Sequence, residues 1–420
     1  MSIVNLSKLK YYCKENRFMI QLQRIYREIG VWQMRIYWAT KLRGFLRHLS
    51  QNNDDVQFSE DNSRYYETNS AFAELRYNIF MLPLLDPTGM FKTVTVEGKD
   101  CDYYGSYNKF LNADKPYFIY LENPTALYNY SLGRIKYKIG RSRFEKHLND
   151  PKLRYIVCMS DACRNSFEKI NRPFPETLKS KTIYPFVPDN KNVTEQAVKE
   201  RCKNEYLECL FCVQGKSFVV KGGLETLSAV EKLQKDGYKV RLTVITKTED
   251  LDAYALKKIK ESKNVNLLEF GFSYEELEKI YEKTNVLLQP ASQESFGLTV
   301  LESIKSGCTV IASKLYAFPE MVEDGVNGFL VEPKYWFFDR NNIPNPKVWN
   351  HRKKTIFNTN ESEDLIAELY QRIKELSEDR SKLEEFSLNS LEKSRTKFGE
   401  ENILSQWKDV WQTLENSHKK

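Results

Sequence analysis

The stretch QPASQESFGLTVLESIKSGCTVIAS, residues 289–313, reads as the end of one strand, a short turn, a helix and a second strand. The helix is predicted to begin near Gly297 to Thr299 and to end at Gly307, because glycine favours the backbone found just past a helix. Its first turn presents unpaired N–H groups and the positive end of the helix dipole, which suits a phosphate. Gly297 lets a phosphate approach the backbone, and Thr299 adds a hydroxyl. The sequence therefore predicts a phosphate site at this turn.

Two glutamates flank the predicted phosphate site. Glu302 lies one turn inside the helix, where a carboxylate repels phosphate at contact distance but can accept two hydrogen bonds from a vicinal diol such as ribose. Glu294 precedes the helix on the opposite side of the phosphate position, within reach of a sugar. The pattern predicts a site for a nucleotide that carries a sugar.

A second stretch, VQGKSFVVKGGLETLSA at residues 213–229, supplies cations. Lys216 and Lys221 are five residues apart, and Gly222 and Gly223 open the next predicted helix. Two lysines that converge on a diphosphate opposite a helix N-terminus can stabilise a leaving nucleotide without a metal. Each motif alone is weak, and their combination carries the prediction.

Short apolar runs alternate with helical patterns through the second half of the chain. The runs are CLFCV, VRLTVIT, VNLLEF, NVLLQP and CTVIAS, and the helices between them are predicted near residues 224–233, 252–260, 274–282 and 298–306. This succession predicts a mostly parallel sheet covered on both faces. Ligands of such sheets bind at the carboxyl ends of the strands, so the loops after CLFCV and NVLLQP are the ones to inspect.

The sequence PASQESFGLTVLESIKSGCTVIAS, followed by FPEMVEDGVNGFLVEP, closely resembles the signature of the large retaining, nucleotide-sugar-dependent glycosyltransferase family of GT-B fold, the E-x7-E or family 4 type. The resemblance covers about residues 207–333. It implies an α/β protein with two Rossmann-like domains that face each other across a cleft. It also implies that Glu294 contacts the donor sugar near the reacting carbon and that Glu302 holds the ribose. The backbone of Phe296, Gly297 and Leu298 would then meet the pyrophosphate.

The family's G-R…K-G pair falls on Gly215, Lys216, Lys221 and Gly222. Lysine stands where arginine is usual at the first cation, which keeps the charge but loses bidentate geometry. With Glu294, Lys216 and Lys221 are the predicted catalytic residues. The expected reaction needs no metal and no cofactor besides the nucleoside-diphosphate sugar.

The first half of the chain matches this family less well. Candidate strands are residues 92–96, 117–121, 155–159 and 182–184, and YIVCMSDACRNSF and KTIYPFVPDN are similar to family segments. No glycine-rich loop follows a first strand, so residues 1–90 are interpreted as a rebuilt part of the acceptor domain. Glu122, Asn123 or Ser160, at predicted strand ends, are expected to face the cleft.

The predicted domains follow from these patterns. Residues 1–190 form the acceptor-side domain, and the polar stretch 187–204 holds the boundary. Residues 205–395 form the nucleotide-sugar-binding domain. Residues 396–420 form a C-terminal helix that is expected to cross back to the first domain.

A basic arm opens the chain. Residues 1–48 contain ten Lys or Arg and two Glu, a net charge of +8, whereas the whole chain carries +7. Phe18, Leu22, Ile25, Ile29 and Trp32 recur at helical spacing, so residues 1–50 are predicted to form a basic amphipathic helix. Such a helix can lie on an anionic membrane, and it can equally pack onto the protein's own core. Nucleic acid is a less favoured partner, because no recognised nucleic-acid motif accompanies the arm.

Two sequence patterns bear on whether the chain binds a metal ion. Cys209 and Cys212 lie in a predicted buried strand, where positions three apart point to opposite faces and cannot share a metal. Asp100 and Asp102 form the D-x-D pattern that single-domain, metal-dependent glycosyltransferases use, in a segment that resembles a surface turn. The favoured prediction is therefore no metal site.

The leading prediction is a retaining glycosyltransferase that works in bacterial-type cell-surface polysaccharide or glycoconjugate synthesis. Its acceptor would be a carbohydrate, a lipid-linked group or a protein. The beginning of the chain shows no apolar signal segment, and no run of about 18 uncharged apolar residues occurs, so a cytoplasmic protein, peripheral on the inner face of the membrane, is expected. A nucleotide-binding scaffold without activity, and a glycosyltransferase that acts on nucleic acid, remain as alternatives.

Overall fold

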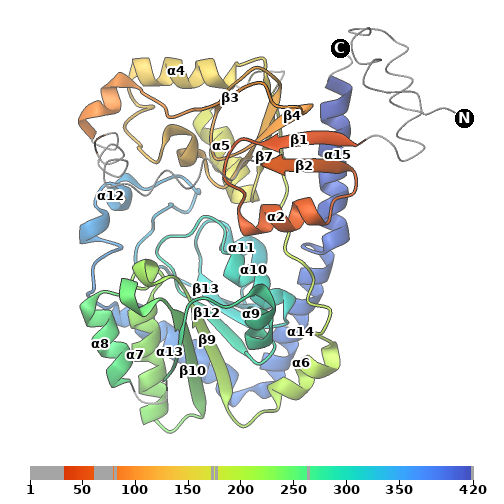
Figure 1. Ribbon diagram of the computed structural model, residues 1–420. Helices are drawn as coiled ribbons and strands as arrows, with labels where there is room; N and C mark the ends of the chain where they lie inside the picture. The colour runs from red at the N-terminus through yellow and green to blue at the C-terminus, as the bar shows by residue number, and fades with distance from the viewer. Residues whose placement is uncertain are drawn as a thin grey trace, which may run out of the picture.

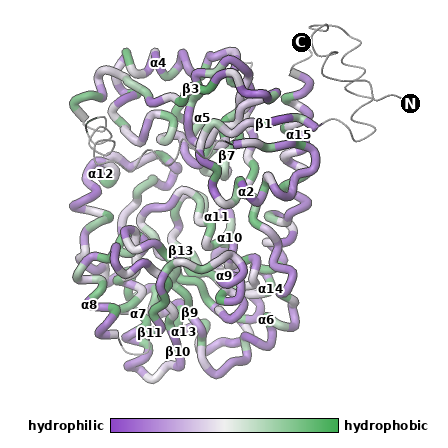
Figure 2. Tube along the Cα trace, viewed as in Figure 1, coloured by the Kyte–Doolittle hydropathy of each residue, from purple (hydrophilic) through white to green (hydrophobic). Residues whose placement is uncertain are grey.

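The computed structural model describes residues 33–60, 79, 83–171, 175, 178–262 and 265–417. Within these residues the chain forms two α/β domains, one stacked on the other, and a long C-terminal helix that runs along the side of the N-terminal domain (Figure 1). Hydrophobic residues gather on the central strands, and hydrophilic residues predominate along the outer helices (Figure 2).

The C-terminal domain is built on a six-stranded, entirely parallel sheet. Its strand order is β11-β10-β9-β12-β13-β14, the order 3-2-1-4-5-6 of a dinucleotide-binding sheet. The central strands are apolar throughout because helices cover both of their faces. The strands are β9 (Leu207–Cys212), β10 (Val240–Thr246), β11 (Val265–Glu269), β12 (Val286–Gln289), β13 (Thr309–Ser313) and β14 (Gly328–Val331).

Helices and short turns connect and cover this sheet. The predicted helices appear as α7 (Gly223–Lys235), α8 (Ala253–Glu261), α9 (Tyr274–Tyr281) and α10 (Leu298–Lys305). The remaining elements are η5 (Gly215–Ser217), η6 (Thr248–Asp250), α11 (Phe318–Met321), α12 (Pro346–Trp349), η7 (Arg352–Lys354), α13 (Glu363–Glu378) and α14 (Arg380–Thr396). Helix α6 (Glu195–Cys202) packs on α14, so this domain begins before the predicted residue 205.

The N-terminal domain is also a parallel six-stranded sheet, in the order β2-β1-β4-β6-β7-β8. The strands are β1 (Met34–Trp38), β2 (Val56–Glu60), β4 (Tyr103–Tyr107), β6 (Tyr117–Leu121), β7 (Leu153–Cys158) and β8 (Lys179–Thr182). The helical elements are α2 (Gly44–Gln51), η3 (Pro83–Thr88), η4 (Pro124–Tyr128), α4 (Lys138–Leu148) and α5 (Asp161–Asn171). Strands β3 (Val94–Val96) and β5 (Leu111–Ala113) form a separate small sheet. The prediction of two Rossmann-like domains is confirmed.

The predicted helix over residues 1–50 is wrong at Met34–Trp38, whereas residues 44–50 are helical. Met34–Trp38 form β1, a strand of the main sheet between β2 and β4, and the helix begins only at Gly44. Ile36 and Trp38 are buried in the core. Their burial in the sheet outweighs the helical pattern of the sequence in this segment. Residues 1–32, with the apolar stripe from Phe18 to Trp32, lie outside the described residues.

The last helix, α15 (Glu400–Ser417), packs on the N-terminal domain. Trp411 is fully buried, with its ring 5.5 Å from that of Phe118 and 4.8 Å from that of Trp407. The backbone carbonyl of Leu414 accepts a 2.6 Å hydrogen bond from the Tyr103 hydroxyl. The C-terminal helix therefore completes the core of the N-terminal domain.

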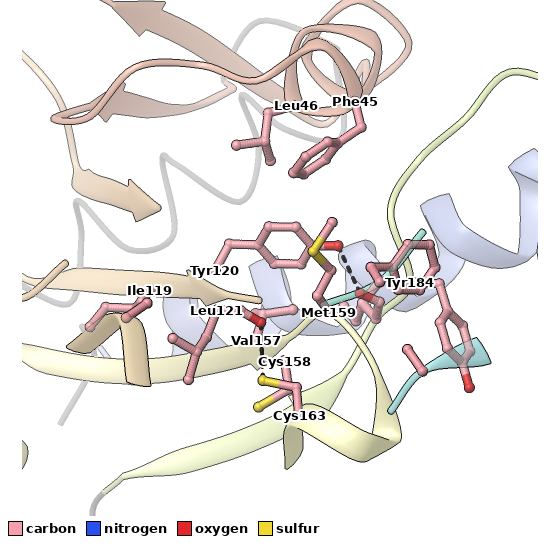
Figure 3. Packing of buried hydrophobic residues seen from close by; sticks show 14 of the residues in the cluster. Phe45, Leu46, Ile119, Tyr120, Leu121, Val157, Cys158, Met159, Cys163 and Tyr184 are labelled. Atoms are coloured by element: carbon pink, nitrogen blue, oxygen red, sulfur yellow. Dashed lines mark hydrogen bonds between the residues drawn. The ribbon is translucent and has the colours of Figure 1, made fainter. Parts of the chain in front are cut away.

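The core beneath the cleft joins strand ends to the linker between domains (Figure 3). Tyr120, at the end of β6, points toward Phe45 of α2, and its hydroxyl donates to the backbone carbonyl of Ile183 at 2.9 Å. The Cys163 thiol of α5 donates to the carbonyl of Leu121 at 3.2 Å. These contacts fix the carboxyl end of β6, from which the chain enters the cleft.

Among the described residues, none of the helices combines the length and the apolar character that crossing a bilayer would require.

Candidate functional site

A cavity of about 350 Å³ lies between the two domains. Each wall includes the point where its sheet reverses strand order, between β1 and β4 in one domain and between β9 and β12 in the other. The N-terminal wall consists of Arg43, Phe45, Tyr107, Glu122 and Met159, and the C-terminal wall of Cys212, Val213, Gln214, Ser217, Lys221, Gln289 and Glu294 to Thr299. The two topological switch points thus face each other across one cavity.

The start of α10 lies in the C-terminal wall, as predicted for the phosphate site. Gly297 has φ of +95° and caps the helix, and a side chain there would come within 2.4 Å of the Phe318 ring. Only glycine fits this combination of backbone and space. The wall also contains Phe296, Leu298 and Thr299. Unpaired N–H groups of the first turn therefore border the cavity.

Lys221 and Glu294 form an ion pair in the same wall. The Lys221 ammonium lies 3.0 Å from Glu294 Oε2 and also donates to the carbonyl of Gln293. Glu294 Oε1 accepts from the backbone N–H of Ser295 at 2.9 Å. The two side chains are 16% and 21% exposed, so they can meet a ligand while their geometry is fixed. A cation beside a helix N-terminus suits a diphosphate.

The loop after β9 is held against the loop after β12 by close backbone contacts. Gly222 has φ of +80°, and a side chain there would come within 2.5 Å of the Pro290 carbonyl oxygen. The backbone N–H of Ser292 donates to the carbonyl of Val220 at 2.9 Å. This packing brings Lys221 beside Glu294, although 73 residues separate them in sequence.

Lys216 lies apart from the other predicted site residues. Its side chain is 82% exposed, and its ammonium lies 3.8 Å from Asp250 Oδ1. Gly215 packs under the carbonyl of Lys247, where a side chain would collide at 2.2 Å. Neither residue lines the cavity. Of the two predicted lysines, only Lys221 lies there with Glu294.

Glu302 belongs to α10 but does not line the cavity. Its Oε2 accepts a 3.0 Å hydrogen bond from the Tyr281 hydroxyl. Burial raises the pKa of Glu302 to about 7, although the Tyr281 hydroxyl acts in the opposite direction. It adjoins a separate narrow hollow with Tyr274 and Leu277. Binding of a ribose diol by Glu302 stays a prediction.

This raised pKa predicts proton release on binding. A ribose diol donates to a carboxylate, so a sugar nucleotide would bind the ionised form of Glu302 more tightly. As the pH falls below about 7, the carboxyl gains a proton and the dissociation constant should rise, by at most about tenfold per pH unit. Titration calorimetry with the nucleoside-diphosphate sugar that binds the chain, in buffers of different ionisation enthalpy, measures the protons released.

Glu302→Gln is the matched control, because glutamine keeps the shape of the side chain and does not titrate. The diphosphate of a nucleoside-diphosphate sugar is esterified at both ends and does not titrate in this range. If the wild type and Glu302→Gln show the same pH dependence, Glu302 does not contact the ligand.

The N-terminal wall carries a carboxylate that three side chains orient. Glu122 follows β6, and its Oε1 accepts from the Tyr130 hydroxyl at 3.0 Å and from Asn123 Nδ2 at 3.3 Å. Its Oε2 accepts from the Tyr107 hydroxyl. Asn123 Nδ2 also donates to Ser295 Oγ at 3.0 Å, a direct hydrogen bond between the domains. Glu122 lines the cavity, as expected from its place at a strand end.

Ser160 does not line the cavity. It is fully buried, and its hydroxyl accepts from the backbone N–H of Cys163 in the first turn of α5. Arg43 and Tyr107 line the cavity and were not predicted. Arg43 follows β1 and Tyr107 ends β4. Neither strand was predicted from the sequence, so the positions of these two residues could not be predicted either.

The D-x-D aspartates pair with an arginine. Asp100 lies 2.6 Å from an Arg35 guanidinium nitrogen, and Asp102 accepts the Arg35 backbone N–H at 2.8 Å. Neither aspartate lines the cavity. The described part of the chain contains no cluster of three or more His, Cys, Asp or Glu residues suited to a metal.

A larger hollow of about 870 Å³ lies at the other end of the C-terminal sheet, around the starts of β9, β10 and β11. Ligands of parallel sheets bind at the carboxyl ends of strands. The smaller cavity between the domains lies at the carboxyl ends of the strands and is lined by the charged side chains of Lys221, Glu294 and Glu122. It is therefore the candidate site.

The comparisons to known proteins place the C-terminal domain near one family. A family model for "Glycosyl transferases group 1" matches residues 208–336. An uncharacterized 41.2 kDa protein in the cps region of Klebsiella pneumoniae is 30% identical over 136 residues, which are 29% of this chain and 37% of that protein. A sucrose synthase of Melioribacter roseus is 46% identical over 54 residues, 13% of this chain and 7% of the synthase. The chain thus spans well under half the length of these curated relatives.

Among solved structures, Alr3699/HepE of Anabaena in complex with UDP-glucose has a similar fold. The TM-score is 0.57 at 14% identity, over 91% of this chain and 100% of that one. The matched segment, residues 208–336, contains β9 and β12 and the loops that form the C-terminal wall. Residues 208–336 thus match the group 1 glycosyltransferases, and the fold of the chain is GT-B.

Proposed function

We propose that the chain transfers a sugar from a nucleoside-diphosphate sugar to an acceptor. The observation that carries this proposal is the single cavity between two switch points, with the α10 start, Lys221 and Glu294 on one wall and Glu122 on the other. The family description and the UDP-glucose complex of the Anabaena structure support it.

In the proposed reaction the diphosphate is the leaving group. The start of α10 and the Lys221 ammonium would stabilise its developing charge, and Glu294 would orient the donor sugar near the reacting carbon. The bond from that carbon to the phosphate oxygen breaks as the acceptor oxygen bonds to the same face of the sugar. The released phosphate oxygen takes the acceptor's proton. This course retains the anomeric configuration and needs no metal ion.

The acceptor that we propose is a carbohydrate or a lipid-linked group of a cell-surface polysaccharide or glycoconjugate. The description of one relative as a protein in a cps region supports this choice. The cations of residues 1–32 support a cytoplasmic, membrane-peripheral place of work. Those residues lie outside the described structure.

A two-step experiment tests the function. Thermal unfolding with UDP, GDP and ADP identifies the base, since a ligand that binds the folded state raises the unfolding temperature. Transfer from the sugar nucleotides of that base to a panel of saccharide and lipid-linked acceptors is then measured with and without a chelator. NMR of the product gives the anomeric configuration.

The expected result is transfer that survives the chelator and gives the same anomer as the donor. Nucleotide binding without transfer to any acceptor would favour a scaffold, and loss of transfer in chelator would overturn the metal-free course. An inverted product would overturn retention.

A further inference from the structure

One surface of the N-terminal domain exposes large apolar side chains next to free cations. Leu84 of η3 is 83% exposed, Met90 just after η3 is 39% exposed, and Tyr137 and Ile139 at the start of α4 are 49% and 57% exposed. We call this surface, together with the cations of residues 136–146, the η3–α4 face. Single exposed apolar residues are ordinary, but several that adjoin one another mark an interaction site.

The two parts of the face are held in direct contact. A side chain added at Gly89, just after η3, would lie 2.3 Å from the Cα of Gly140 in α4. The Arg143 guanidinium donates to the carbonyl of Thr88 at 2.8 Å. The backbones of η3 and α4 therefore touch, and their exposed apolar side chains lie on adjoining elements.

The charge of the face is strongly positive. Residues 136–146 contain Lys136, Lys138, Arg141, Arg143 and Lys146 against one acid, Glu145. Arg141 pairs with Glu145 at 3.0 Å. The three lysines are exposed and form no ion pair with any described part of the chain. Ile139, Arg143 and Lys146 follow each other at spacings of four and three, so they share one side of α4.

We propose that the η3–α4 face docks on an anionic lipid bilayer. Aliphatic side chains can enter the interface between headgroups and acyl chains, tyrosine suits that interface, and lysines reach anionic headgroups on long stems. A nucleic acid offers no apolar layer for Leu84 and Ile139. The proposal rests on these side chains, and it depends neither on the arm of residues 1–32 nor on sugar transfer.

The position of the face fits this role. Helix α4 lies at the outer end of the N-terminal domain, on the side away from the C-terminal domain (Figure 1). A membrane bound there leaves the cavity and the C-terminal domain uncovered.

Flotation of the full chain tests the proposal, with vesicles of phosphatidylcholine alone and of phosphatidylcholine with phosphatidylglycerol. Lys136→Gln/Lys138→Gln/Lys146→Gln should lower binding to the anionic vesicles by about a hundredfold, at about fivefold for each cation. Leu84→Ser/Ile139→Ser should also lower it, and high salt should weaken the wild type. Thermal unfolding checks that each variant is folded, as expected for exposed positions.

Two controls separate this face from other sources of charge. Lys347→Gln/Lys353→Gln/Lys354→Gln removes the same charge from exposed lysines elsewhere and should bind as the wild type does. Lys8→Gln/Lys10→Gln/Lys14→Gln removes it from the arm. The proposal is overturned if the η3–α4 variants bind the vesicles as the wild type does. This includes the case in which only the arm variant loses binding and the case in which no chain floats. It is also overturned if the wild type retains RNA in a gel shift but ignores both vesicles.

Discussion

Replacement of Lys221 by methionine is expected to lower kcat for sugar transfer by about 10²-fold or more. Lys221 is the lysine that lines the cavity, and its ammonium lies 3.0 Å from Glu294. Methionine keeps much of the side-chain volume but removes the charge that would stabilise the leaving diphosphate. It also leaves the Glu294 carboxylate without its cation in a partly buried site, which adds to the loss. Steady-state kinetics with the donor identified by thermal unfolding measures the effect.

Two further lysine variants make this result interpretable. Lys232→Met, on the exposed surface of α7, is expected to leave kcat unchanged. Lys216→Met should cost less than Lys221→Met, because Lys216 is 82% exposed and faces Asp250. Equal losses at both would show that the loop after β9 closes over the donor. If Lys221→Met keeps both kcat and nucleotide affinity, the site is misplaced.

Replacement of Trp411 by alanine is expected to lower the free energy of unfolding by about 3–5 kcal/mol. Its indole is fully buried on α15 and contacts the rings of Phe58, Phe118 and Trp407. The change would open a large void between the last helix and the N-terminal sheet. Urea denaturation followed by circular dichroism measures the loss.

Trp336→Ala is the matched control, since Trp336 is only partly buried and stacks with Arg340. It should lower the free energy of unfolding by about 1 kcal/mol or less. A similar small loss for Trp411→Ala would mean that α15 does not anchor the N-terminal domain.

The C-terminal sheet could be predicted because its information is local. The runs CLFCV, VRLTVIT, VNLLEF, NVLLQP and CTVIAS became β9 to β13, and each predicted helix between them is present. Continuous apolar strands are typical of a parallel sheet buried on both faces. The helix start at Gly297 is also encoded within a few residues.

The N-terminal sheet was harder to predict. Met34–Trp38 carry Arg35 between buried residues and follow a cation-rich helical pattern, and Tyr103–Tyr107 contain a glycine. Gly105 is needed there because a side chain would come within 2.8 Å of the Trp38 ring. Trp38 lies 67 positions before Gly105 and is its neighbour only because β1 pairs with β4. No local sequence pattern therefore reveals why glycine is needed at this position.

The site divides in the same way. Glu294 to Thr299 reach the cavity as predicted, because one turn places them all. Arg43 and Tyr107 reach it only through the order of the strands, which tertiary packing sets. Tyr281 next to Glu302, and Asp250 next to Lys216, likewise come from separate elements.

The return of α15 to the N-terminal domain also has a consequence for how the protein is made. A ribosome delivers β1 and β4 long before residues 400–417, yet these residues supply part of the surface that covers their sheet. Domains generally fold as units in the order of synthesis. Here the domain that emerges first would mature last, after the second domain has already folded, and until then Phe58 and Phe118 would lack their aromatic partner Trp411. We therefore expect the nascent N-terminal sheet to expose apolar surface to chaperones during translation.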